Sequence, residues 1–142
     1  DHNSYQSPDD INQLDWGRKQ EYHDVFQYYR ALISLRRDVP ALRMRSSEEI
    51  RRYLRFSPVY QIGMVSYVIK DYPGENRWKI MQLIFNASVK TVNADLMENG
   101  RWTVLASGDE ISLTGLRQFE GQHVPVPPIS MMIVVKRSED SQ

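Results

Sequence analysis

The run Lys79–Phe85 (KIMQLIF) decides the fold class of this chain, because it is apolar on both faces when read as a strand. Such a short run between turn signals is typical of a central strand that is covered on both sides. A second strand-like run, Met64–Lys70 (MVSYVIK), precedes it, and Tyr72-Pro73-Gly74 supplies a turn between the two. No long helix separates these runs, so we expect them to lie in an antiparallel sheet.

Further strand-like runs follow towards the C-terminus: Thr91–Leu96, Trp102–Ala106, Ile111–Leu113, His123–Val126 and Ile129–Lys136. Asn99-Gly100 is a typical hairpin turn, so 91–96 is expected to pair with 102–106. Pro127-Pro128 confines the joint between the last two runs to an edge or a bend. Several short strands linked by turns predict an antiparallel β-sandwich over residues 56–142.

The first 55 residues are different, because their main feature is a long amphipathic helix expected from Gln20 to Arg37. Its apolar side chains recur at spacings of three and four and form one wide stripe: Tyr22, Val25, Phe26, Tyr29, Leu32 and Ile33. Pro40 ends this helix, and a short helix with a capping box follows from Ser46 to Leu54. The rest of this segment is too small to cover the stripe, so we expect the chain to be a piece of a larger protein.

Composition excludes several classes of partner. Eighteen basic residues balance eighteen acidic ones, so no field of one sign recruits nucleic acid or an anionic membrane. No apolar run approaches the roughly 18–20 residues of a membrane span. The chain has no cysteine, which excludes disulfides and thiolate metal sites. Cysteine usage does not separate a bacterial cytoplasmic location from a secreted one.

The residues that usually carry chemistry are sparse. His2, His23 and His123 are scattered without the spacing of a metal site, and we expect no metal and no cofactor. Asp9 and Asp10 are adjacent, so they cannot flank one glycosidic bond as a catalytic pair must. On local evidence they either favour a helix N-terminus through its dipole or contact a polar ligand, and both interpretations stay open.

The opening segment Asn3–Trp16 (NSYQSPDDINQLDW), with the following YHDVFQYYRALISLRRDVPALRM, resembles the end of the catalytic barrel in the α-amylase superfamily, glycoside hydrolase family 13. Within that superfamily it resembles the type I pullulanases, which cleave α-1,6 branches in pullulan and starch-derived dextrins. Their N-S-Y-x-S-P-D-x-x-N-x-x-D-W segment follows the eighth barrel strand and lies beside the active-site cleft. The run VPVPPISMMIVVK resembles the C-terminal β-sandwich that caps such enzymes.

The resemblance implies a mainly β fold: a C-terminal antiparallel β-sandwich (56–142) preceded by a helical segment (1–55) from the end of a (β/α)8 barrel. That segment would be the last βα loop and the last helix of an incomplete barrel. The resemblance implies that four residues bind substrate: Asp9, Asn3, Tyr5 and Asn12. Asp9 would accept hydrogen bonds from a glucose hydroxyl, whereas Asn3 and Tyr5 would contact substrate or shape the loop. Asp15 and Trp16 would hold the base of the loop.

The catalytic carboxylates of this family lie on earlier barrel strands, and their motifs do not occur here, so no residue of this chain is expected to be catalytic. The resemblance therefore implies that the chain is structural or accessory and inactive alone. Its α-glucan partner, pullulan or a branched dextrin, would be bound through the parent enzyme. The missing catalytic barrel is the expected protein partner, and self-association through the exposed helix is the alternative without it.

Two other functions stay open on the sequence. In the first of these, the β-sandwich is a stand-alone α-glucan-binding module that stacks sugar on an exposed aromatic ring. Core or structural packing is the favoured interpretation for both Trp78 and Trp102. Trp78 is the candidate for stacking because it lies between a turn and a strand, whereas Trp102 alternates within a strand. In the second, the chain is a small interaction protein whose amphipathic helix docks on a partner.

Overall fold

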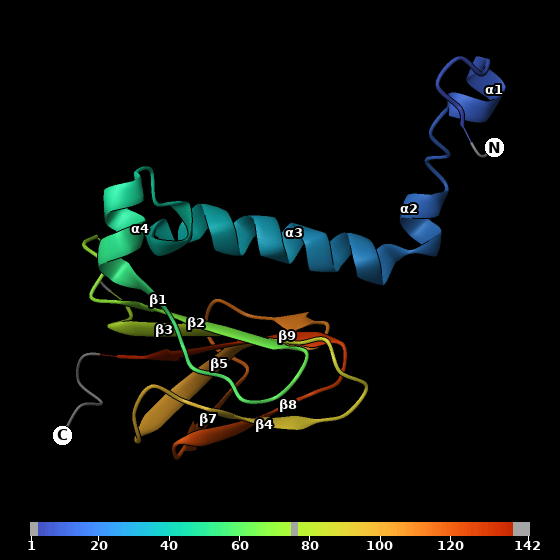
Figure 1. Ribbon diagram of the computed structural model, residues 1–142. Helices are drawn as coiled ribbons and strands as arrows, with labels where there is room; N and C mark the ends of the chain where they lie inside the picture. The colour runs from blue at the N-terminus through green and yellow to red at the C-terminus, as the bar shows by residue number, and fades with distance from the viewer. Residues whose placement is uncertain (1–2, 75–76, 138–142) are drawn as a thin grey trace.

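The computed structural model describes residues 3–74 and 77–137, and it has a helical N-terminal part followed by a β-sandwich (Figure 1). The helices are α1 (Asp9–Asn12), α2 (Arg18–Glu21), α3 (His23–Asp38) and α4 (Ser47–Tyr53), with the 3-10 helix η1 (Pro40–Arg43). The strands are β1 (Leu54–Phe56), β2 (Met64–Lys70), β3 (Ile80–Asn86), β4 (Val92–Asp95), β5 (Arg101–Ser107), β6 (Glu110–Ile111), β7 (Arg117–Glu120), β8 (His123–Val126) and β9 (Ser130–Lys136). This arrangement confirms the expected fold class, a mainly antiparallel β-sandwich preceded by helices.

The larger of the two sheets has seven strands in the order β1-β2-β3-β9-β5-β6, and β7 also pairs with β5. All of its pairings are antiparallel, with Leu83 of β3 opposite Tyr67 of β2 and Ile133 of β9. The prediction that 79–85 is a central strand is confirmed, because β3 lies between two neighbours and is buried at six of its seven positions. The smaller sheet contains only β4 and β8.

The hairpin expected between 91–96 and 102–106 is wrong. β4 pairs with β8, with Ala94 opposite Val124, whereas β5 pairs with β9, β6 and β7 in the other sheet. Asn99-Gly100 therefore belongs to a crossover that carries the chain from the small sheet to the large one. The turn residues are those of a hairpin, but they do not determine which strands pair.

Two buried polar side chains of the large sheet hold this crossover in place. Gln82 is fully buried, and its Oε1 accepts a hydrogen bond from the Met97 N–H at 2.9 Å. The buried Lys136 ammonium donates to Glu98 Oε1 at 2.7 Å and to the Asn99 carbonyl at 3.2 Å. These bonds join residues that are 15, 38 and 37 positions apart in the chain, so they are invisible to local sequence patterns.

The large sheet separates two apolar cores. The core between the two sheets contains Met64, Val68, Ile80, Ile84, Ala94, Leu96, Trp102, Val104, Val124, Val126, Met132 and Val134. The core on the opposite face contains Leu35, Val39, Ala41, Ile69, Trp78, Met81, Leu83, Leu105, Ala106, Ile133 and Val135. Figure 1 shows α3 lying across this second face. The end of α3 thus packs on the sheet, although the sequence suggested that the helical part has too little to pack against.

The helix boundaries differ from the expectation at both ends of the helical part. The predicted helix 20–37 is interrupted at Tyr22, whose φ of −109° and ψ of 47° separate α2 from α3. The expected cap of α4 is present, because Ser46 Oγ accepts from the Glu49 N–H at 3.1 Å. Helix α4 ends at Tyr53, because the chain enters β1 at Leu54.

Candidate functional site

The N-terminal loop, residues 3–16, is held together by its own hydrogen bonds. The Asn12 amide donates to the Ser4 carbonyl at 2.9 Å and to the Ser7 carbonyl at 2.7 Å. The single turn α1 follows Pro8, and Asp9 and Asp10 occupy its first turn, as the dipole favours. Asn12 thus joins two separate points of the loop through one side chain.

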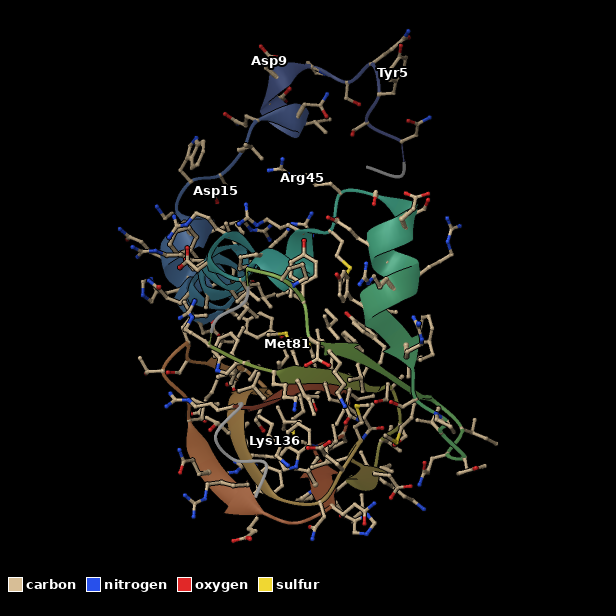
Figure 2. All side chains as sticks on the ribbon, turned by 90° about the vertical axis from the view of Figure 1, so that its left-hand side faces the viewer. Tyr5, Asp9, Asp15, Arg45, Met81 and Lys136 are labelled. Carbon is tan, nitrogen blue, oxygen red and sulfur yellow. The ribbon has the colours of Figure 1, made fainter. Side chains whose placement is uncertain are left out.

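The other predicted substrate-binding residues lie on the same loop and face water. Asn3 Oδ1 accepts from the Tyr5 N–H at 3.2 Å, which fixes a local turn, and the Tyr5 side chain is 86% exposed. Asp9 makes no side-chain hydrogen bond or ion pair with any described residue. Figure 2 shows Tyr5 and Asp9 at the end of the molecule that is furthest from the β-sandwich. The loop therefore presents a carboxylate and a phenol to solvent.

Asp15, one of the two residues expected to hold the base of the loop, makes a local hydrogen bond there. Asp15 Oδ1 accepts from the Gly17 N–H at 2.9 Å, and a Cβ at Gly17 would lie 3.1 Å from that same oxygen. Trp16 is 75% exposed and contributes no buried anchor. The loop can accept hydrogen bonds from a polar ligand, but it holds no opposed pair of carboxylates that could cleave one.

Helix α3 exposes a second apolar face beside the one that packs on the sheet. We call this face the outer stripe of α3; it consists of Tyr22, which directly precedes the helix, and of Val25, Phe26, Tyr29 and Ile33 within it, with exposed fractions of 47%, 48%, 36%, 61% and 66%. Leu32 belongs to the predicted stripe but is half-buried towards the sheet. Leu35, which that stripe omits, is the buried anchor of α3. The helix therefore has two adjoining apolar faces. One packs on the sheet, whereas on the other the Lys19 ammonium lies 4.4 Å from the Phe26 ring centroid and the Arg18 guanidinium lies 5.9 Å from the Tyr22 ring centroid.

A cavity of about 1170 Å³, the α3 cavity, lies between the N-terminal half of α3 and one end of the large sheet. Its walls include Tyr28 and Leu32 from the helix, and Phe85, Ile129 and Met131 from the sheet side. The sequence analysis missed it, because the lining comes from segments far apart in the chain. No local motif marks such a space.

The favoured interpretation of Trp78, packing in the core, is confirmed, and the alternative of an exposed stacking residue is wrong. Its side chain is buried in the helix-side core, and the Arg77 guanidinium lies 4.8 Å from its ring centroid. Trp102 is in the other core as expected, and its Nε1 donates to the Glu98 carbonyl at 3.2 Å. Neither tryptophan offers a ring face to a sugar.

Within residues 3–74 and 77–137, no group of three or more histidine, aspartate or glutamate side chains is arranged to hold a metal ion. His23 lies within 3.1 Å of the Gln27 amide, and His123 Nδ1 lies 2.8 Å from Asp95 Oδ1. His2 is outside the described residues. None of the described helices combines the length and apolarity needed to cross a membrane.

Comparison with known proteins connects this arrangement to one family. Residues 50–110 match the family model for the all-β domain of pullulanase. A pullulanase of Bacillus subtilis (strain 168) is 40% identical over 90 residues, which is 63% of this chain. The structure of a pullulanase from Bacillus acidopullulyticus superposes on 96% of this chain with a TM-score of 0.88 and 33% identity. The type I pullulanase of Bacillus subtilis, solved in complex with maltose, covers the same share with a TM-score of 0.84 and 32% identity.

This chain spans only a small part of those relatives: 12% of the Bacillus subtilis sequence, and 16% and 19% of the two solved chains. The expected relationship to the pullulanases is confirmed, and the match of 96% of this chain includes its helical part as well as the sandwich. The similarity is consistent with the C-terminal part of a pullulanase.

Proposed function

We propose that this chain is the C-terminal part of an α-glucan debranching glycoside hydrolase that cleaves α-1,6-glucosidic bonds. Residues 1–55 complete its catalytic barrel, and residues 56–142 form a β-sandwich that covers the barrel surface. The relationship to pullulanases, one of them solved with maltose, supports this reaction and this substrate class. Pullulan and branched dextrins are bound by the parent protein.

The observation that carries the proposal is the outer stripe of α3. Four large apolar side chains at helical spacing are exposed to water along α3, and the exposed Tyr22 directly precedes them. The helix already packs on the sandwich by its other face. An isolated domain does not gain stability from such a surface, and contiguous exposed apolar patches mark interaction sites. A helix packed between a barrel and a sandwich needs two apolar faces, and α3 has both.

In this proposal the N-terminal loop is part of the substrate cleft. The loops at the C-terminal face of (β/α)8 barrels carry substrate contacts. Asp9 accepts hydrogen bonds from a glucose hydroxyl, and Tyr5 lies on the same exposed side of the molecule. Asn12 holds the loop closed through Ser4 and Ser7, and Asn3 fixes the turn that carries Tyr5.

The chain alone is structural or accessory. Glycoside hydrolysis needs two carboxyl groups roughly 5–10 Å apart on opposite sides of the scissile bond. The loop provides Asp9 and Asp10 in successive positions of one helical turn, which cannot surround a sugar. The nucleophile and the general acid come from the rest of the barrel.

The test compares the protein encoded by the complete gene with this chain, each purified and incubated with pullulan. Release of reducing ends by the complete protein, and none by the chain, is the expected result. Hydrolysis by the chain at a rate near that of the complete protein would refute the accessory role. A complete gene that encodes no barrel upstream of this chain would refute the whole proposal.

A further inference from the structure

The α3 cavity is open to solvent although its walls are mainly apolar. Tyr28 and Leu32 form its roof, and Phe85 and Met131 form its floor; all four are half-buried. The charged residues that line it are Asp24 and Asp109, and both are carboxylates. Neither forms an ion pair with any described residue. The cavity thus combines apolar walls with two carboxylates that form no ion pair within the described residues, and Asp24 lies in the first turn of α3.

Ile129, on the rim of the cavity, has an unusual backbone conformation. Its φ is 47°, a region that β-branched residues rarely adopt, and its side chain is 68% exposed. The surrounding bonds hold it there: its N–H donates to the Ser88 carbonyl at 3.0 Å, and Ser130 Oγ donates to the Pro127 carbonyl at 2.7 Å. Strained positions persist only where the neighbouring structure imposes them, and they gather at ligand contacts.

Val25 connects the cavity to the outer stripe of α3, because it belongs to both. A partner that covers the stripe is therefore adjacent to the cavity mouth. The two carboxylates define the charge of what enters, since an interface places opposite charges together.

We propose that the α3 cavity receives an apolar segment of the parent catalytic barrel that carries a lysine or an arginine. The aliphatic part of that segment packs on Phe85, Leu32 and Ile129, and its cation faces Asp24 and Asp109. This inference rests on the proposed function and adds a specific point of attachment to it. The outer stripe provides most of the apolar contact area with the barrel. The cavity fixes how the barrel and the sandwich are aligned.

Two substitutions test the proposal, each made in the complete protein and in the isolated chain. Ile129→Gly removes the rim side chain and also relieves the positive φ. In the isolated chain we expect its melting temperature to change by no more than about 2 °C, because relief of strain offsets the greater entropy of the unfolded chain. In the complete protein we expect a larger fall in melting temperature, because the contact between this side chain and the barrel segment is lost.

Asp24→Lys places a cation where the proposal needs an anion. We expect it to lower the melting temperature of the complete protein more than that of the isolated chain. Any destabilisation of the α3 N-terminus by the new cation is the same in both proteins, so the difference reports the contact with the barrel segment. Glu120→Lys, on the exposed strand β7, is the matched control and should shift both proteins alike.

Equal shifts in the two proteins for Ile129→Gly and for Asp24→Lys would overturn the inference. A dimer of the isolated chain in sedimentation velocity that Asp24→Lys dissociates would also overturn it, since the occupant would be a second copy. These outcomes are independent of pullulan hydrolysis, so the inference can fail while the proposed function stands. A complete protein without a barrel or without pullulan hydrolysis would instead be a failure of the proposed function.

Discussion

Replacing Glu98 with glutamine should destabilise this fold more than replacing its partner Lys136 with methionine. The Lys136 side chain is only 4% exposed, whereas the Glu98 side chain is 35% exposed. Removing the carboxylate charge leaves a buried ammonium without its counter-charge. Removing the ammonium leaves a carboxylate that water can still reach. The two halves of one ion pair are therefore unequal in what their loss costs.

The structure sets the size of the difference. A buried charge that loses its partner costs about 3–5 kcal/mol, but here the Asn99 carbonyl, at 3.2 Å, still accepts from Lys136. The amide oxygen introduced by Glu98→Gln can accept as well, so we expect a loss of about 2 kcal/mol. Lys136→Met removes the cation together with its desolvation cost, and its effect should be within about 1 kcal/mol. The double variant should be close to Lys136→Met.

Urea unfolding followed by tryptophan fluorescence measures these differences, and acid pH adds a second test. The hydrogen bond from Lys136, and then the positive charges of Lys136, Lys70 and Lys79, hold the pKa of Glu98 below its usual value, against the opposing effect of desolvation. A carboxyl whose pKa is lower in the folded state stabilises the fold above its unfolded pKa of about 4.3. That contribution is lost as the pH falls through the lowered pKa of the folded state. The difference in the free energy of unfolding between the wild-type chain and Glu98→Gln should therefore shrink in acid.

The reasoning would be refuted by Lys136→Met being the more harmful substitution, or by a gap that widens as the pH falls. If both single variants lost the same free energy of unfolding, and the double variant were less stable than either, the pair would not act as described.

Three further outcomes are expected. In the complete protein, Asp9→Asn should lower kcat/KM for pullulan by about 10–100-fold, the value of a hydrogen bond to a charged group, whereas Asp10→Asn, its neighbour outside the family motif, should change it less than about twofold. The isolated chain should self-associate with rising concentration in sedimentation velocity, and Phe26→Glu in the outer stripe should abolish this; a wild-type chain that stays monomeric at high concentration would contradict it. Leu35→Ala should cost the chain about 2–4 kcal/mol in urea unfolding, whereas Ile33→Ala, at an exposed position of the same helix, should stay within about 0.5 kcal/mol; equal losses would contradict the packing described.

Much of the strand layout could be predicted from local patterns. β2, β3, β8 and β9 are found where alternation or apolar runs predict strands, because side-chain period and burial coincide there. The pairing of β4 could not be predicted, since its partner β8 and the side chains of Gln82 and Lys136 that bond the crossover after it come from other parts of the chain. β1 and β7, with three and four residues, are too short to give a periodic signal.

The candidate site divides in the same way. Local spacing predicts a helical turn at Asp9 and Asp10, but only the resemblance to a family proposes a substrate role for Asp9. The helix shows the limit of a periodic pattern: Leu32 and Ile33 are neighbours in one predicted stripe, yet they end on different sides of α3. Adjacent helical residues are about 100° apart, and the sequence does not say which of two adjoining faces meets the sheet.

The position of Leu35, Val39 and Ala41 has a practical consequence for anyone who cuts this protein into parts. These residues precede the proposed domain boundary, yet they cover Met81, Ile133 and Val135 on the sheet. A β-sandwich that starts at residue 56 would expose this apolar face of the large sheet and would also lose most of β1. It should therefore aggregate on expression. A transplanted sandwich should therefore carry the segment from Leu35 onwards with it.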